Sequence, residues 1–284
     1  MAIFRKSYDY YLGYALGGGG AKGFAHLGAL KALESKGLKP DIVAGTSAGA
    51  LAGAFYADGY APDEIAELFQ DKVFREFVGI TLPKVGFFKT AGLLKFIKKN
   101  LRAKSFEQLQ IPFVAVATDW KKARAVPFSQ GKELAEAVVA SCSIPIIFYP
   151  QYIDEVPYVD GGLFKNLPVS IIRQECKYVI GINVVPIMPA TDKPNIKNIA
   201  ERTFKLMSIS NTIIDRHLSD VLIEAEGTEK YTMFDLDNIE QISEIGYSCA
   251  SDVINDPKHQ HLVRRCLRHE QLEKMVQQKL NRKK

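Results

Sequence analysis

The 284-residue chain contains no long hydrophobic run. Its longest stretch without a charged residue, 137–153, has 17 residues and includes Pro145 and Pro150. A membrane-spanning helix needs about 20 predominantly apolar residues, and proline interrupts helices. The first residues also lack the contiguous apolar region and cleavage site of a secretory signal. We therefore expect a cytoplasmic protein without a membrane-spanning segment.

Cysteine is scarce as well. The four cysteines lie far apart and form no C-x-x-C pair, so the sequence indicates neither a zinc site nor a disulfide framework. We expect thiols that are buried or idle in a reducing compartment.

Glycine and proline number only 21 and 13, while 47% of the residues are hydrophobic. These figures exclude collagen-like, linker-like and disordered chains. The chain has no internal repeat or low-complexity linker, and its length fits one large α/β domain.

Acidic residues are few in one basic segment and missing from another. Residues 258–284 carry a net charge of +7, whereas the whole chain carries +5, so residues 1–257 sum to −2. Residues 77–106 contain seven Lys and Arg but no Asp or Glu. In 84–104 the basic residues alternate with Phe, Leu and Ile, as in an amphipathic segment on an anionic membrane. The alternative is an ordinary helix with its apolar stripe in the core. No nucleic-acid recognition motif accompanies these charges.

Short apolar runs alternate with helical patterns along the chain. We expect strands over 10–16, 41–44, 112–118, 178–184 and 231–236, and helices over 21–36, 47–57, 62–77, 132–140, 196–225 and from 256 onward. This alternation predicts an α/β fold with a parallel sheet covered on both faces.

The sequence Gly45-Thr46-Ser47-Ala48-Gly49 is a G-x-S-x-G motif between a predicted strand and a predicted helix. A nucleophilic serine in this context sits on a sharp turn that exposes its Oγ, and the flanking glycines avoid clashes across that turn. The alternative is a serine that only caps the following helix. We expect Ser47 to be a nucleophile.

A second motif, Gly17 to Gly23, also follows a strand and opens a helix. A dinucleotide loop would need an acidic residue at the end of the next strand, but Asp41 begins that strand. Bare N–H groups beside a nucleophile would instead form an oxyanion hole. Lys22 is expected to reinforce this loop or its positive field.

The third motif is Asp160-Gly161-Gly162, which by itself also reads as an ordinary Asp-Gly turn. A nucleophilic serine needs a base, and histidine is the usual one. Four of the five histidines lie in charged runs that indicate solvated surface: His217, His259, His261 and His269. The fifth, His26, is expected to pack or cap within its helix. Asp160 is therefore the better candidate base, provided that burial raises its pKa.

Together these motifs resemble the patatin-like phospholipases. The resemblance covers roughly 10–185, and it includes the glycine loop with Phe24 to Gly28, the 45–49 motif, Ala140 to Pro145, and Tyr158 to Gly162 followed by Asn166-Leu167-Pro168. It implies a three-layer α/β/α sandwich with a mostly parallel sheet. It also implies a lipid acyl hydrolase that uses a Ser–Asp dyad without cofactor or metal.

Carried over by motif position, Ser47 is the nucleophile and Asp160 the base. The oxyanion hole would be formed by Gly18, Gly19 and Gly20, with Lys22, Gly23, Gly45, Gly49, Gly161 and Gly162 supporting the motifs. We place the hydrolase domain in 1–255 and a basic helical tail in 256–284.

The chain departs from the family pattern at three positions. Lys22 stands where Arg is commoner, Gly162 where Ala is frequent, and Ile146 where a small residue follows Ile-Pro. We expect Ile146 to reshape the acyl channel.

Three alternatives stay open: a soluble carboxylesterase or thioesterase, a nucleotide-binding module, and a catalytically silent scaffold. As partners we expect an acyl-ester substrate, no nucleic acid, and peripheral contact with the inner, anionic face of a membrane through 84–104, a candidate lid, and the basic tail.

Overall fold

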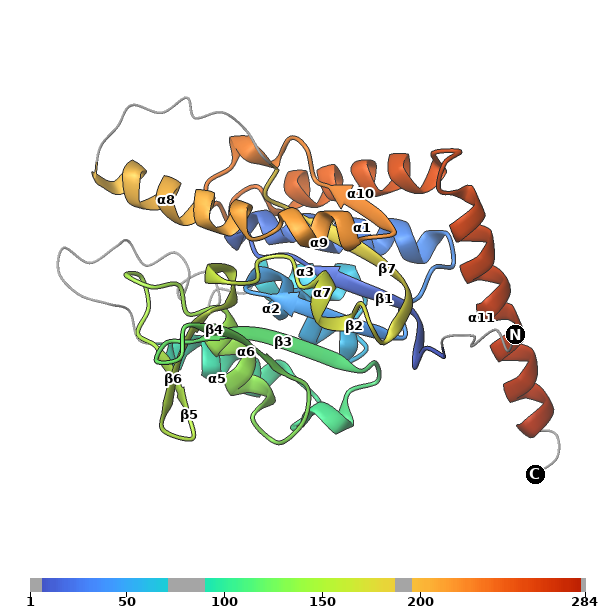
Figure 1. The fold of residues 1–284 in the computed structure, drawn as a ribbon, viewed down its shortest axis with the longest axis horizontal. Helices are drawn as coiled ribbons and strands as arrows, with labels where there is room; N and C mark the ends of the chain where they lie inside the picture. The colour runs from blue at the N-terminus through green and yellow to red at the C-terminus, as the bar shows by residue number, and fades with distance from the viewer. Residues whose placement is uncertain (1–6, 71–89, 187–195, 282–284) are drawn as a thin grey trace, which may run out of the picture.

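A computed structural model describes residues 7–70, 90–186 and 196–281 of the chain. Their centre is an eight-stranded sheet in the order β5-β6-β3-β2-β1-β7-β8, with β4 paired to β3 beside this path (Figure 1). The strands are β1 Tyr10–Leu16, β2 Ile42–Thr46, β3 Phe113–Asp119, β4 Arg124–Phe128, β5 Gln151–Ile153, β6 Val156–Asp160, β7 Cys176–Asn183 and β8 Val221–Glu224.

The five strands β1, β2, β3, β7 and β8 run parallel. Leu16 at the end of β1 lies beside Gly45 of β2 and Ile182 of β7, so the carboxyl ends of these strands meet at one edge of the sheet. Ligand sites of open α/β sheets form at this edge. The predicted mostly parallel sheet is confirmed.

Helices cover both faces of the sheet. They are α1 Phe24–Ser35, α2 Ala48–Ala57, α3 Pro62–Gln70, α5 Ala91–Asn100, α6 Leu134–Ser141, α7 Val169–Ile172, α8 Ile196–Ser210, α9 Ile213–Leu218, α10 Ile239–Asn255 and α11 Gln260–Asn281. Alternating residues of β1 point into two separate cores: Tyr14 and Leu16 pack with α1, α2 and α6, whereas Ala15 packs with α7. Side chains of a strand alternate between faces, so the fold has three layers.

Helices α1 and α10 pack with their backbones almost in contact. A Cβ atom on Gly28 of α1 would lie 1.8 Å from the carbonyl oxygen of Ser243, and one on Gly246 of α10 would lie 1.9 Å from that of Ala25. Only glycine fits at such a crossing. The two glycines therefore fix α10 against the helix that follows the glycine loop.

Strand β3 brings together two distant parts of the chain, β2 and β6, because both pair with it. Strand β2 pairs with β3 up to Thr46 opposite Val116, and β6 pairs with the next residues of β3, with Asp160 opposite Ala117. Strand β4 pairs with 115–119 and thus takes the other edge of β3. Strands β2 and β6 therefore run toward each other along one edge of β3 and end at the same point.

Two predicted elements are wrong. The strand predicted over 231–236 is a loop, and the helix predicted over 196–225 contains α8, α9 and the strand β8. The apolar run of β8 pairs with β7, and this pairing overrides the helical pattern that precedes it. Of the helix predicted over 62–77, residues 71–77 lie outside the described residues.

The two basic segments lie in different settings. In α5 the side chains of Leu93, Phe96 and Ile97 are buried, so its apolar stripe packs into the core; residues 84–89 lie outside the described part. Helix α11 runs along the end of the molecule away from β5 and β6 (Figure 1). Among the described residues, no helix is long and apolar enough to cross a bilayer.

Candidate active site

Ser47 occupies the sharp turn between β2 and α2. Its backbone has φ 54° and ψ −123°, a conformation that costs a non-glycine residue of order 1–3 kcal/mol and marks functional turns. The turn is close to its neighbours, because a Cβ on Gly49 would lie 2.2 Å from the carbonyl oxygen of Leu16. The Ser47 N–H donates to Ser141 Oγ at 2.8 Å. The structure thus holds the hydroxyl of Ser47 at the carboxyl edge of the sheet.

Asp160 lies against Ser47. The Ser47 Oγ–H donates to Asp160 Oδ2 at 2.6 Å, and Asp160 Oδ1 accepts from the Gly162 N–H at 2.7 Å. The backbone of Asp160 is held on both sides, because its N–H donates to the Ser143 carbonyl and its own carbonyl accepts from Thr118 Oγ1. Both oxygens of the carboxylate therefore have a partner, and one of them faces the serine hydroxyl.

The Asp160 carboxyl is 1% exposed. Burial raises its pKa to about 7, against the lowering effect of the hydrogen bonds from Ser47 and Gly162. A carboxylate with a pKa near neutrality is a competent proton acceptor, because a large fraction of it is ionised at physiological pH and that form is still basic. The environment thus supplies the condition that an aspartate base requires.

The glycine loop lies beside this pair. Gly18 N–H donates to the Asn166 carbonyl at 3.0 Å, so it is engaged within the protein. The N–H groups of Gly19 and Gly20 have no acceptor in the part of the chain that the structure describes. Gly20 has φ +59°, a left-handed conformation that favours glycine. Two of the three predicted donors are consequently available to a bound ligand.

None of the five histidines, all of which lie in the described part of the chain, is hydrogen-bonded to Ser47 or Asp160. His26 is fully buried, and its Nε2–H donates to the carbonyl of Gly17 at 2.7 Å. This hydrogen bond holds the first residue of the glycine loop. Burial lowers the pKa of His26 to about 4, so the ring is neutral. The expectation of packing or capping for His26 is confirmed. His269 is not simply solvated, because its ring stacks on Tyr11 with 3.8 Å between centroids.

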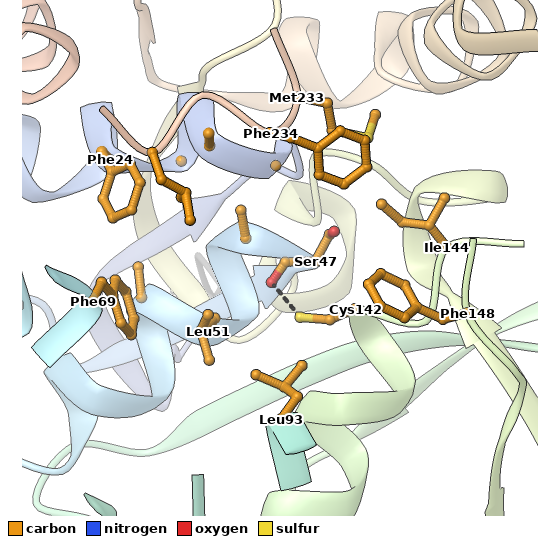
Figure 2. A pocket seen from close by; sticks show the side chains of 16 residues that line it. Phe24, Ser47, Leu51, Phe69, Leu93, Cys142, Ile144, Phe148, Met233 and Phe234 are labelled. Atoms are coloured by element: carbon orange, nitrogen blue, oxygen red, sulfur yellow. Dashed lines mark hydrogen bonds between the residues drawn. The ribbon is translucent and has the colours of Figure 1, made fainter. Parts of the chain in front are cut away.

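An apolar cavity of about 710 Å³, its open mouth included, extends from Ser47. Figure 2 shows the side chains around Ser47: Phe24, Leu51, Phe69, Leu93, Cys142, Ile144, Phe148, Met233 and Phe234. The cavity suits a hydrocarbon chain.

Two sequence interpretations change at this cavity. Ile146 does not line it: the side chain is 77% exposed, whereas Ile144 and Phe148 line the cavity. The loop over 231–236, predicted as a strand, contributes Met233 and Phe234 to the wall instead.

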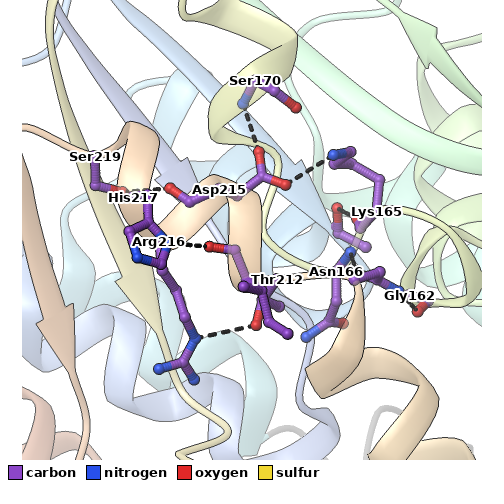
Figure 3. A network of polar contacts seen from close by, with 12 residues as sticks. Gly162, Lys165, Asn166, Ser170, Thr212, Asp215, Arg216, His217 and Ser219 are labelled. Carbon is purple, nitrogen blue, oxygen red and sulfur yellow. Dashed lines mark hydrogen bonds and ion pairs between the residues drawn. The ribbon is translucent and has the colours of Figure 1, made fainter.

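A polar network formed by α9 and by the link between α8 and α9 holds the segment that follows Asp160 (Figure 3). Asn211 Nδ2 donates to the Gly162 carbonyl at 2.8 Å, and Asn211 Oδ1 accepts from the Asn166 N–H at 2.7 Å. The fully buried Asp215 accepts from Lys165 Nζ at 2.7 Å and from the Ser170 N–H. Sequence analysis missed Asn211 and Asp215, because a lone Asn and Asp in a helical pattern carry no motif.

No group of three or more His, Cys, Asp or Glu side chains that could hold a metal ion occurs within residues 7–70, 90–186 and 196–281. The site is thus built from a serine hydroxyl, one carboxylate and backbone amides. Such an arrangement can activate the hydroxyl and stabilise negative charge beside it.

These features define a class: α/β proteins with a Ser–Asp pair at the carboxyl edge of a mostly parallel sheet, next to a glycine loop. The chain belongs to the patatin-like phospholipases, a family of lipid hydrolases, since the family model matches residues 14–172. The resemblance inferred from the motifs is therefore confirmed.

Individual relatives are similar at modest identity. An uncharacterized NTE family protein of Mycobacterium bovis is 32% identical over 189 residues, which cover 64% of this chain and 52% of that protein. Lysophospholipase NTE1 of Kluyveromyces lactis is 28% identical, with 86% of this chain and 19% of that protein covered. The chain thus spans about half or less of the length of these relatives. The solved structure of VipD from Legionella pneumophila aligns with 16% identity and a TM-score of 0.48, over 88% of this chain and 67% of the other.

Proposed function

We propose that the protein is a lipid acyl hydrolase of the phospholipase A or lysophospholipase type, with Ser47 as nucleophile and Asp160 as base. The observation that carries this proposal is the 2.6 Å hydrogen bond from Ser47 Oγ to the buried Asp160 carboxylate. Membership of the patatin-like phospholipases and the similarity to a lysophospholipase support a lipid substrate.

In the first half of the reaction, Ser47 Oγ attacks the ester carbonyl carbon while its proton moves to Asp160 Oδ2. The negative charge that forms on the carbonyl oxygen is stabilised by the free N–H groups of Gly19 and Gly20. Asp160 then returns the proton to the oxygen of the leaving alcohol as the C–O bond breaks. The acyl group remains on Ser47 as an ester.

In the second half, a water molecule replaces the alcohol. The oxygen of the water attacks the acyl carbon while Asp160 takes a proton from the water. Asp160 then protonates Ser47 Oγ as the fatty acid leaves. One carboxylate thus serves as base and acid in turn, for which a pKa of about 7 is suited.

The apolar cavity favours long acyl chains over small ones. Its walls are formed almost entirely by Phe, Leu, Ile, Met and Ala side chains, and each buried CH₂ contributes about 0.8 kcal/mol. We therefore expect kcat/KM for p-nitrophenyl esters to rise with chain length up to the depth of the cavity. A small-substrate carboxylesterase or thioesterase would prefer acetyl and butyryl esters instead.

The dyad is tested by substitution of Ser47. Ser47→Ala should abolish hydrolysis and labelling by a fluorophosphonate probe while the far-UV circular dichroism stays unchanged. The matched control is Ser129→Ala, because Ser129 is exposed on the loop after β4. Retained turnover in Ser47→Ala would remove the nucleophile assignment, and labelling of the wild type excludes a silent scaffold.

We also propose that the protein is cytoplasmic and meets its substrate at the anionic face of a membrane. All four cysteines are free thiols, which fits a reducing compartment. Because the apolar stripe of α5 is buried, such contact rests on lysine and arginine charge. Co-sedimentation with liposomes should therefore require anionic lipid and be lost at 0.5–1 M salt, where the screening length falls to about 3–4 Å.

A further inference from the structure

The acyl cavity has an open end and a buried end. Figure 2 shows Phe148 and Phe234 on one side of the cavity, and the Phe234 side chain is exposed there. Phe24 and Phe69 lie on the other side of the view, and both are buried. An acyl chain that is bonded to Ser47 can therefore extend inward until it reaches these two rings.

Helix α2 forms the wall between Ser47 and the buried end. The α2 residues that line the cavity are Ala48, Leu51 and Ala52. They share one face of the helix, because residues three or four apart are neighbours on its surface. Phe55 is the next residue along α2 in this spacing, and its ring lies 5.7 Å from the ring of Phe69, measured between centroids. Phe55 lies about 12 Å from Ser47 along the helix, so an acyl chain meets Phe69 at about this depth.

Aromatic neighbours hold the Phe69 ring in place. It lies edge-on to the rings of Phe55 and Phe24, with 5.7 and 5.9 Å between centroids, and 6.2 Å from that of Phe96. Edge-to-face pairs at these distances are attractive, and Phe55 and Phe96 are themselves buried. The Phe69 ring therefore cannot swing aside for a longer chain without losing these contacts.

We propose that Phe69 sets the maximum length of the acyl chain that the cavity holds. Each CH₂ group that enters the apolar cavity should raise kcat/KM, by up to about fourfold, because its transfer from water is favourable. A chain that already reaches Phe69 has to fold back or leave its last carbons in water, so further CH₂ groups add nothing. The proposal rests on the proposed hydrolase function and names the residue that limits its acyl-chain specificity.

The test measures kcat/KM for p-nitrophenyl esters from butyrate to palmitate at one fixed detergent concentration. In the wild type, kcat/KM should rise with chain length and then level off or fall. Phe69→Ala removes an aromatic ring and leaves a space of the kind that binds a benzene molecule. This variant should move the chain length of highest kcat/KM up by about two to four carbons.

Ala52→Leu tests the opposite direction. Ala52 lies on the wall between Ser47 and Phe69, so a leucine side chain there fills the cavity before its end. The preferred chain should become shorter by about two to four carbons. A general loss of stability cannot move the preferred length in opposite directions, and Ala52→Leu decides alone if Phe69→Ala does not fold.

The matched control is Phe106→Ala. Phe106 and Phe69 are each 4% exposed, but Phe106 stacks on Phe113 of β3 and is not among the described residues that line the cavity. This variant should lose stability and keep the chain-length preference of the wild type. An unchanged preference in folded Phe69→Ala or in Ala52→Leu, or an equal shift in Phe106→Ala, would overturn the proposal. If the wild type hydrolyses no ester of the series and Ser47 is not labelled by a fluorophosphonate probe, the proposed function fails instead.

Discussion

Ser47 and Asp160 are 113 residues apart in the chain, and their side chains meet because β2 and β6 end at the same point on one edge of β3. Thr46 is the last residue of β2 opposite β3, and Asp160 is the last residue of β6. The hydrogen bond between the two side chains is therefore a consequence of sheet register. A change in the register of β6 by one residue would turn the carboxylate to the other face.

The first prediction concerns the pH dependence of activity. Asp160 must be ionised to accept the proton of Ser47, and burial raises its pKa to about 7. With a non-ionising ester as substrate, kcat/KM should fall about tenfold per pH unit below pH ~7 and level off above it. A profile that stays flat down to pH 5 would show that Asp160 is not the base.

The second prediction concerns stability. The pKa of Asp160 is higher in the folded protein than the ~3.9 of an unfolded chain. Folding is therefore favoured by this group at low pH, and that contribution is lost as pH rises from about 4 to about 7. At three pH units and ~1.4 kcal/mol per unit, the loss reaches ~4 kcal/mol.

The variant Asp160→Asn isolates this contribution. Asparagine does not ionise, so the variant should not lose this contribution as the pH rises. Urea denaturation should therefore show that the unfolding free energy of the variant increases relative to that of the wild type from pH 4 to pH 8. Asp154→Asn is the control, because Asp154 is exposed in the β5–β6 turn. A constant difference across this range would contradict the raised pKa.

The third prediction concerns Asn211, a positioning residue. Asn211→Ala leaves the Gly162 carbonyl and the Asn166 N–H without their partner, which should cost about 1–3 kcal/mol of stability. Because Gly162 N–H holds Asp160 Oδ1, a small shift of this segment should lower kcat by about 10- to 100-fold with little change in KM.

The control for Asn211 is Asn255→Ala, at the exposed end of α10. If Asn211→Ala loses stability but keeps the kcat and the pH profile of the wild type, the role of Asn211 is structural only.

The fourth prediction concerns the contact between α1 and α10. Gly28→Ala or Gly246→Ala inserts a methyl group less than 2 Å from a backbone carbonyl oxygen, so the helices must separate. We expect a loss of at least ~2 kcal/mol in unfolding free energy, in line with other overpacking substitutions. Gly92→Ala, at an exposed position of α5, should instead be neutral or stabilising by up to about 1 kcal/mol.

The central strands and the three motifs could be predicted from sequence because each carries a local signal. Apolar runs mark the four strands β1, β2, β3 and β7, and those of β2, β3 and β7 contain β-branched residues. The glycines of the 45–49 motif permit the tight turn at Ser47. The sequence also led to Asp160 once no histidine had a suitable setting.

Other features are not local and therefore could not be predicted. The strand β8 depends on its partner β7, and Asn211 acts on Gly162 from 49 residues away. The short strands β4 and β5 have few residues, and only Ile153 among them is buried. The apolar stripe of α5 is identical in sequence whether it faces a membrane or a core, and only the fold shows that it is buried.

The most direct test of the account is to trap the acyl-enzyme. Wild-type protein is mixed with an excess of a long-chain p-nitrophenyl ester, quenched in acid within the first turnover, digested, and analysed by mass spectrometry. The account predicts one acyl group, carried by the hydroxyl of Ser47, and none in Ser47→Ala. An acyl group on another residue, or turnover with no acylated peptide in the quenched wild type, would contradict it.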